Sequence, residues 1–165
     1  MAYTIRLYRD DDAEALSELA LAAIRVVGAH GYSEAQVAAW AARHPGPEMY
    51  RERAAKGHVI FVAVDGEDRP VAYALLEPDG HLDRIYNHPD HTRQGLATRL
   101  LAAAEKHARS EEMTRLYTEA SELARTAFEH AGYAVTHRRD FEIDGIPIHN
   151  FAMEKVLEAP SSKLR

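Results

Sequence analysis

The sequence predicts a single α+β domain built on a mixed, mostly antiparallel twisted sheet, and three observations lead to this prediction. The chain has 165 residues, of which 46% are hydrophobic, which is enough for one compact core. Segments of strand-like period alternate with segments of helical period along almost the entire length. Three apolar strands follow one another directly, which indicates an antiparallel meander, and a later strand–helix–strand order indicates a parallel pair. We expect this domain to span residues 1–157 and residues 158–165 to form a flexible tail.

The first third of the chain is predicted to contain one strand and three helices. Asp10, Asp11 and Asp12 suit a helix N-terminus, and Ser33 followed by Gln36 forms a capping-box pattern. The break His44-Pro45-Gly46-Pro47 separates the last two helices. The expected elements are a strand over residues 3–8 and helices over about 13–27, 34–42 and 48–55.

The remainder is predicted to alternate strands with two helices. Pro89 ends the third strand of the meander, Gly132 ends the last helix, and Asp144-Gly145 turns the final hairpin. The expected strands cover residues 59–64, 71–77, 82–87, 115–120, 133–143 and 146–156. The expected helices run from near Gln94 to Ala108 and from Ser121 or Glu122 to Ala131.

Composition excludes several classes of function. The chain has no cysteine, so disulfides, thiolate metal sites and cysteine nucleophiles are excluded. The formal net charge of −6 argues against a nucleic-acid partner and is compatible with a cationic substrate. No apolar run is long enough for a membrane span, and the N-terminus lacks the pattern of a signal peptide. We therefore expect a cytoplasmic protein without a membrane partner. His88 and His91 are the nearest approach to a metal motif, and we expect no metal site.

The loop between the third meander strand and the following helix has the features of an anion site. Gly95 removes a Cβ where the helix begins, Arg93 adds a charged fork, and free backbone N–H groups at a helix N-terminus attract phosphate. The local residues are equally compatible with an ordinary strand-to-helix turn and a solvated arginine. The lysine of a nucleotide-binding P-loop is absent, which disfavours a nucleotide enzyme using this loop.

The segment His88-Pro89-Asp90-His91-Thr92-Arg93-Gln94-Gly95-Leu96-Ala97 resembles the acetyl-CoA-binding motif of the GNAT superfamily of N-acetyltransferases. Gly95 and Ala97 match the last two positions of the family pattern, whereas Thr92 stands where glutamine or arginine is usual. The predicted order of elements is similar to the family along almost the entire chain. The ending Asn150-Phe151-Ala152-Met153-Glu154-Lys155 resembles small bacterial members of the YafP-like type.

The resemblance implies a GNAT fold, with helices on both faces of the sheet, and acetyl-CoA as co-substrate. The strand 82–87 would splay from strand 116–120, and backbone groups of Ile85 and Asn87 would pair with the pantetheine amides. Ser121 and Phe128 would lie beside the cofactor. The N–H groups of Arg93, Gln94, Gly95, Leu96, Ala97 and Thr98 would bind the pyrophosphate. Tyr86 of the strand and Thr92 of the loop are further cofactor-binding candidates. A homodimer is a further possibility.

The expected chemistry is the transfer of acetyl to a primary amine by direct attack, and the amine can belong to a small molecule, a protein N-terminus or a lysine. A base must take a proton from the amine, and Glu119 and Asp83 are the candidates. Asp83 shares strand parity with Ile85, so we expect both side chains on one face. Each carboxylate also has a structural interpretation: Glu119 as a surface residue and Asp83 as an ion-pair partner of Arg84.

The acid that would protonate the leaving thiolate departs from the family pattern. Phe128 stands where many members have a tyrosine, so either Tyr86 or Tyr117 substitutes, or the thiolate leaves unaided. This departure supports a second hypothesis, a CoA-binding regulator or sensor with little or no catalysis. Trp40, Met49 and Tyr50 either wall the acceptor site or are ordinary packing residues.

Overall fold

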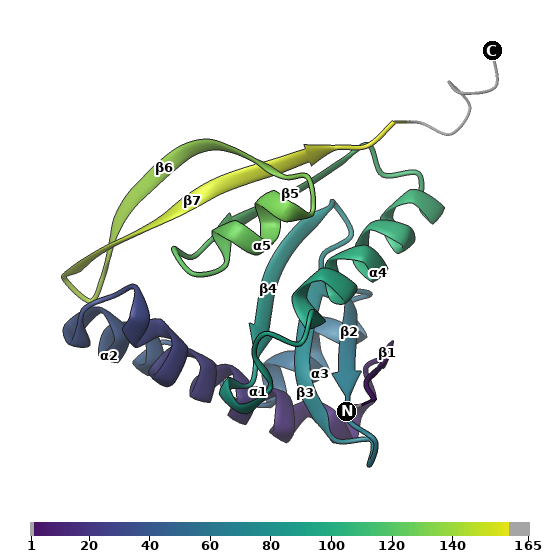
Figure 1. Ribbon diagram of the computed structural model, residues 1–165, viewed down its shortest axis with the longest axis horizontal. Helices are drawn as coiled ribbons and strands as arrows, with labels where there is room; N and C mark the ends of the chain where they lie inside the picture. The colour runs from purple at the N-terminus through teal and green to yellow at the C-terminus, as the bar shows by residue number, and fades with distance from the viewer. Residues whose placement is uncertain (1, 159–165) are drawn as a thin grey trace.

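The computed structural model describes residues 2–158 and folds them into one seven-stranded sheet with α-helices on both faces (Figure 1). The strands lie in the order β1–β2–β3–β4–β5–β7–β6. They are β1 Thr4–Leu7, β2 Val59–Val64, β3 Pro70–Leu76, β4 His81–Asn87, β5 Arg115–Ala120, β6 Ala134–Ile143 and β7 Ile146–Val156. The helices are α1 Ala13–Ala22, α2 Glu34–Ala42, α3 Glu48–Ala55, α4 Leu96–Ser110 and α5 Arg125–His130. The tail predicted from Glu158 onward lies outside the described residues, apart from Glu158 itself.

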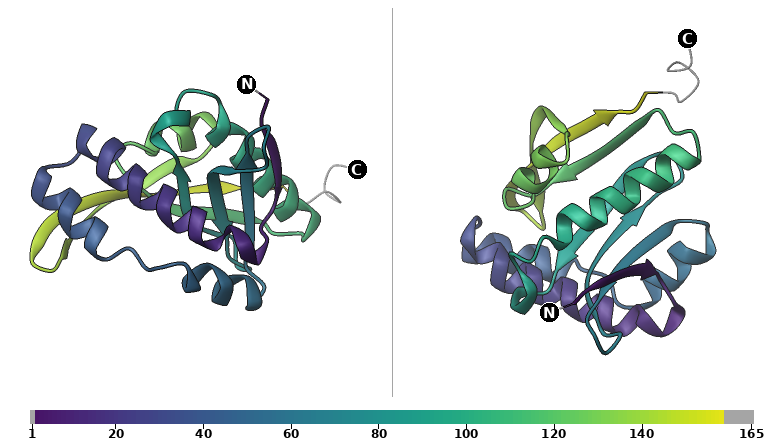
Figure 2. Two further views of the ribbon diagram at one scale, coloured as in Figure 1. Left: turned by 90° about the horizontal axis from the view of Figure 1, so that it is seen from below. Right: turned by 45° about the vertical axis from the view of Figure 1, so that its right-hand side comes forward.

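Each face of the sheet has its own core. On one face α4 packs with Leu100, Leu101 and Ala104 fully buried, together with Leu82 and Leu116 of the sheet. On the other face the buried side chains of α1 and α3 meet Val62, Tyr73 and Leu75. Figure 2 shows α1 running along this second face. The predicted arrangement of helices on both faces is confirmed.

The sheet has the predicted pairing. β2, β3 and β4 form an antiparallel meander, and β4 pairs with β5 in parallel. The turn between β6 and β7 has positive φ at both central residues, Asp144 (50°) and Gly145 (82°), as a tight two-residue β-hairpin turn requires. The capping box is also confirmed, because Ser33 Oγ accepts from Gln36 N and Gln36 Oε1 accepts from Ser33 N.

Three helix boundaries differ from the prediction. The first helix is α-helical only to Ala22 and then continues as a π-helical segment, Ala23–Val27. α4 begins at Leu96 rather than near Gln94, because Gly95 precedes it in a left-handed conformation with φ 74°. α5 begins at Arg125, because the Ser121 hydroxyl and carbonyl accept from Ala124 N–H and form a turn in place of the first predicted helical turn.

Candidate active site

The parallel strands β4 and β5 separate almost at once and leave a wedge between them. Of the residues that the structure describes, only His81 and Leu82 of β4 pair with β5, opposite Tyr117 and Thr118. Thr118 Oγ1 reinforces this end by donating to the Leu82 carbonyl at 2.7 Å. From there β4 continues to Asn87 without a partner on that side, and the predicted splaying is present (Figure 2).

A β-bulge at Asp83 marks the point where the wedge opens. Arg84 pairs with Leu75 of β3, whereas Leu82 pairs with Leu76, so Asp83 is the extra residue. The bulge shifts the alternation of side chains: Ile85 packs with the core under α4, and Asp83 contacts Arg53 of α3 on the opposite face. The expectation that Asp83 and Ile85 share a face is therefore wrong, because parity holds only in an unbulged strand.

The unpaired side of β4 presents backbone groups to the wedge. His88 N–H donates to the Val71 carbonyl of β3. Antiparallel residues alternate between hydrogen-bonded and non-hydrogen-bonded pairs, so Tyr86 and Arg84 also direct their backbone groups to β3. Ile85 and Asn87 consequently direct their N–H and C=O groups into the wedge, where an extended ligand could pair with them.

The loop before α4 has the conformation of an anion-binding turn. Arg93 and Gly95 both have positive φ, at 61° and 74°. Such a turn, followed by the free N–H groups of the first helical turn, converges several donors on one point. An ideal Cβ at Gly95 would meet nothing within 4 Å, so the space beside this loop is open to a ligand.

A small, largely apolar cavity of about 170 Å³ lies between this loop, β4, the π-helical segment and the α5 region. We call it the apolar cavity. Thr92 of the loop, Ala97 of α4 and Asn87 of β4 line it. Asn87 Oδ1 is buried there without a hydrogen-bond partner among the described residues. A buried carbonyl oxygen of this kind needs a donor, and an amide N–H of a pantetheine arm would supply one.

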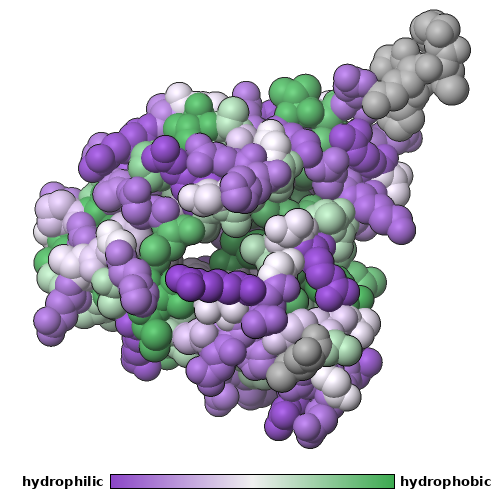
Figure 3. Space-filling model, viewed as in Figure 1, coloured by the Kyte–Doolittle hydropathy of each residue, from purple (hydrophilic) through white to green (hydrophobic). Residues whose placement is uncertain are grey.

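A larger polar cavity of about 300 Å³ adjoins it. It lies between β4 and β5 on one side and the β6–β7 hairpin on the other, and Figure 3 shows the surface hollowed between these two parts of the molecule. Asp83, Arg84, Glu119 and Arg139 contribute charged groups of both signs. The two cavities share five lining residues and therefore lie side by side in the wedge, and we call the pair the passage: Trp40, Ile85, Tyr86, Ser121 and Ala124.

Glu119 is held by an imidazole that bridges two carboxylates. His81 Nε2 lies 2.7 Å from Glu119 Oε1, and His81 Nδ1 lies 3.0 Å from Glu77 Oε1. Burial opposes the charge on His81, but the hydrogen bonds to Glu119 and Glu77 outweigh it and raise the pKa of His81 to about 9. The same contact lowers the pKa of Glu119. At neutral pH the site therefore contains an imidazolium between two carboxylates.

Arg53 of α3 completes this charged cluster. Its Nη2 contacts Glu77 and lies 3.1 Å from Asp83 Oδ2, and its Nε donates to His58 Nδ1 at 2.7 Å. Glu77, His81 and Asp83 bring three potential metal ligands within 4.8 Å of one another. Since Arg53 and His81 already supply the positive charge that these carboxylates require, the cluster is satisfied as a salt-bridge network.

The hydroxyl groups near the wedge differ in their access to the cavities. Tyr86 lines both cavities, and burial raises its pKa. Tyr117 lines neither, and its hydroxyl is bonded to Asp79, which raises its pKa to about 12. Phe128 lines the polar cavity but is 1% exposed, with its ring against Tyr133 at 5.0 Å. Of the two tyrosines suggested as substitutes for the missing acid, only Tyr86 is in place.

The structure gathers most of the predicted site residues around the passage. Nine of them line one or both cavities: Asp83, Ile85, Tyr86, Asn87, Thr92, Ala97, Glu119, Ser121 and Phe128. The other five belong to the loop and the start of α4: Arg93, Gln94, Gly95, Leu96 and Thr98. Trp40 lines both cavities, whereas Tyr50 is fully buried and bonded to Tyr73 and Met49 packs beside that core.

Sequence reasoning missed His81, Arg53 and Arg139. His81 is the first residue of β4, and its position two residues before Asp83 was the one signal of its role in the sequence. Arg53 and Arg139 lie far from the motif in sequence, on α3 and β6. Their role depends on how those elements pack, and nothing local distinguishes them from surface arginines.

Comparisons with known proteins agree with this geometry. The model of the family described as "Acetyltransferase (GNAT) domain" matches residues 29–155. The uncharacterised N-acetyltransferase YafP of Escherichia coli (strain K12) is 28% identical over 149 residues, which is 90% of this chain and 93% of that protein. A solved GCN5-related N-acetyltransferase from Rhodopseudomonas palustris superposes with a TM-score of 0.85 at 29% identity, covering 95% of this chain and 97% of that one.

A second solved structure, the PaiA N-acetyltransferase of Thermoplasma acidophilum in complex with coenzyme A, has a TM-score of 0.76 at 20% identity. The alignment covers 95% of this chain and all of that chain. The predicted GNAT resemblance is confirmed, including its YafP-like character. No helix among residues 2–158 combines the length and apolarity that crossing a membrane would require.

Proposed function

Because the chain belongs to the GNAT family and is an acetyl-CoA-dependent N-acetyltransferase, we propose that it acetylates a primary amine by direct attack, with acetyl-CoA in the wedge and the amine in the polar cavity. One observation carries this proposal: the two cavities meet at the unpaired side of β4 through five shared residues. A thioester at this junction is reachable from both sides. The acyl donor and the acceptor can therefore meet without a covalent enzyme intermediate.

The residues of this chain fit the parts of coenzyme A. The turn at Arg93 and Gly95 and the first N–H groups of α4 would bind the pyrophosphate, with Arg93 as an additional charged contact. The wedge-facing backbone groups of Ile85 and Asn87 would pair with the pantetheine amides as a neighbouring strand would. Thr92 retains the backbone donor at the atypical position of the motif.

Glu119 is the proposed base. Its Oε1 accepts from His81, whereas Oε2 makes no hydrogen bond in the part of the chain that the structure describes. The neutral amine nitrogen attacks the thioester carbonyl carbon, Glu119 takes the proton lost by nitrogen directly or through water, and the carbon–sulfur bond breaks. A backbone N–H near Ile85 would stabilise the oxyanion, and the Tyr86 hydroxyl would donate a proton to the CoA thiolate as it leaves.

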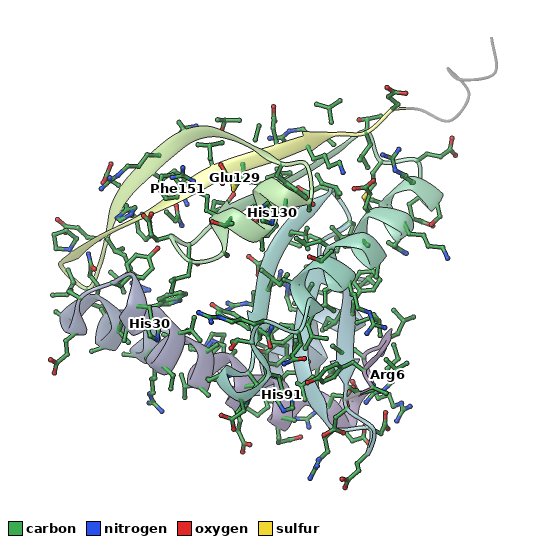
Figure 4. The ribbon with its side chains drawn as sticks, in the orientation of Figure 1. Arg6, His30, His91, Glu129, His130 and Phe151 are labelled. Carbon is green, nitrogen blue, oxygen red and sulfur yellow. The ribbon has the colours of Figure 1, made fainter. Side chains whose placement is uncertain are left out.

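Replacement of Glu119 tests this assignment. We expect Glu119→Gln to lower kcat for thiol release from acetyl-CoA by roughly 10²-fold or more, because it removes the proton acceptor, while coenzyme A affinity stays unchanged. Glu129→Gln is the matched control, since Glu129 lies on α5 and pairs with Arg125 outside both cavities (Figure 4). If kcat is unchanged in Glu119→Gln, Glu119 is not the base. Asp83→Asn would then test the second candidate.

A catalytically weak CoA-binding regulator is the second candidate, and Phe128 is the observation that favours it. The ring is buried in the core and offers no hydroxyl to the leaving thiolate. Calorimetry with coenzyme A, combined with thiol release over a panel of amines, separates the two functions. Tight binding without thiol release for any amine would support the regulator and refute the enzyme.

A further inference from the structure

Arg139 is a cation of the polar cavity that forms no ion pair with a carboxylate among the described residues, and its charge adds to that of His81 in lowering the pKa of Glu119. It lies on β6 and lines the cavity. Its Nη1 donates to the neutral Asn150 side-chain oxygen at 3.0 Å, and its guanidinium carbon lies 5.4 Å from the centre of the Phe141 ring. No carboxylate oxygen of residues 2–158 lies within 4.0 Å of its nitrogens, whereas the adjacent Arg138 pairs with Asp140 at 3.1 Å.

A second arginine, Arg84, lines the same cavity from β4. Arg84 is half-buried, and its Nε makes no hydrogen bond among the described residues. Its single nearby carboxylate, Asp83 Oδ2 at 3.4 Å, is shared with Arg53. Arg84 also lies beside the Tyr86 hydroxyl, and no carboxylate of the described residues holds its guanidinium through two N–H groups at once. A guanidinium of this kind favours an anionic ligand, because a carboxylate can satisfy two N–H groups at once.

The cavity also presents negative charge. Asp83 and Glu119 line it, and Glu119 is the proposed base for the attacking amine. A simple amine or a lysine side chain would bring no anionic group to the two arginines of the cavity. A molecule with both an amine and a carboxylate matches both sets of charges.

We propose that the acceptor is a free amino acid, with its carboxylate bound by Arg139 and Arg84 and its amine directed to Glu119. This inference rests on the proposed acetyltransferase function and names its substrate class. The volume of about 300 Å³ is that of a site for a small molecule. The aromatic side chains of Tyr32, Trp40 and Phe141 line the same cavity and would contact an apolar side chain of the amino acid.

The kinetic test compares amino acids with their decarboxylated amines. Thiol release from acetyl-CoA is measured with the standard amino acids and with matched amines, for example phenylalanine and phenethylamine. We expect the preferred amino acid to exceed its amine at least tenfold in kcat/KM. Arg139→Gln should raise KM for the amino acid roughly 10- to 100-fold, as expected when a charged hydrogen-bonding partner is lost. The same substitution should change KM for the matched amine less than twofold. Arg138→Gln is the control on the same strand and should change neither.

A binding test separates this inference from the proposed function. Trp40 is the only tryptophan of the chain and lines the cavity, so amino-acid binding to the coenzyme A complex should change its fluorescence. Binding that is lost in Arg139→Gln and regained in part in Arg139→Lys, without turnover, would support the carboxylate site and refute the enzymatic function. Turnover of amines without any advantage for amino acids, or equal amino-acid binding in Arg139→Gln, would overturn the carboxylate site and leave the enzymatic function standing.

Discussion

The bridge made by His81 between Glu77 and Glu119 gives a quantitative prediction about stability and pH. In the folded chain the pKa of His81 is about 9, against 6.5 for an unperturbed histidine. The folded state therefore holds this proton more tightly than the unfolded state. The resulting stabilisation is complete below pH 6.5, where both states are protonated, and is lost as pH rises through about 9.

The magnitude follows from the two pKa values. They differ by about 2.5, and each tenfold difference in proton affinity is about 1.4 kcal/mol, so the bridge contributes about 3 kcal/mol at low pH. Only 14% of the His81 side chain is exposed, so solvent screens the bridge little. His81→Gln should destabilise the protein by about 3 kcal/mol more at about pH 6 than at about pH 10. The packing loss of the substitution is the same at both pH values and cancels in this difference.

Urea unfolding monitored by Trp40 fluorescence measures these free energies. The exposed His130 on α5 provides the control, and His130→Gln should track the native protein at every pH (Figure 4). If the free-energy difference between the native protein and His81→Gln is the same at low and high pH, His81 is not held as an imidazolium, and the electrostatic description of the site is wrong.

Three substitutions test how the framework positions the site, each measured by urea unfolding. Gly80→Ala should destabilise by about 3 kcal/mol, because its φ is 98° and a Cβ would lie 2.2 Å from the Arg115 carbonyl oxygen beside the β4–β5 pairing. Gly95→Ala should lower the free energy of unfolding by about 1 kcal/mol, because the φ of Gly95 is 74°. It should also weaken coenzyme A binding, as measured by calorimetry. Gly66→Ala, with open space and no positive φ, is the control for both and should be neutral. Ser33→Ala should lower the free energy of unfolding by about 1 kcal/mol, because the helix cap is lost. An unchanged free energy of unfolding would show that the capping box is dispensable.

Local physical chemistry accounts for what could be predicted from the sequence. Short continuous apolar runs specify β2 and β3, a capping box specifies the start of α2, and Asp144-Gly145 specifies the last hairpin, because each depends on residues within a few positions of one another. The loop around Gly95 was identified for the same reason: a glycine at a helix start leaves backbone donors free wherever the chain folds.

The charged half of the site depends instead on long-range packing. Arg53, His81, Glu119 and Arg139 are spread over α3, β4, β5 and β6, and their contacts exist only because the sheet order brings these elements around one cavity. The bulge at Asp83 arises from the register between β3 and β4, which no local pattern reveals, and it alone decides that Asp83 faces Arg53. The sequence thus predicts where coenzyme A binds, whereas the acceptor side and its balance of charges follow from the assembled sheet.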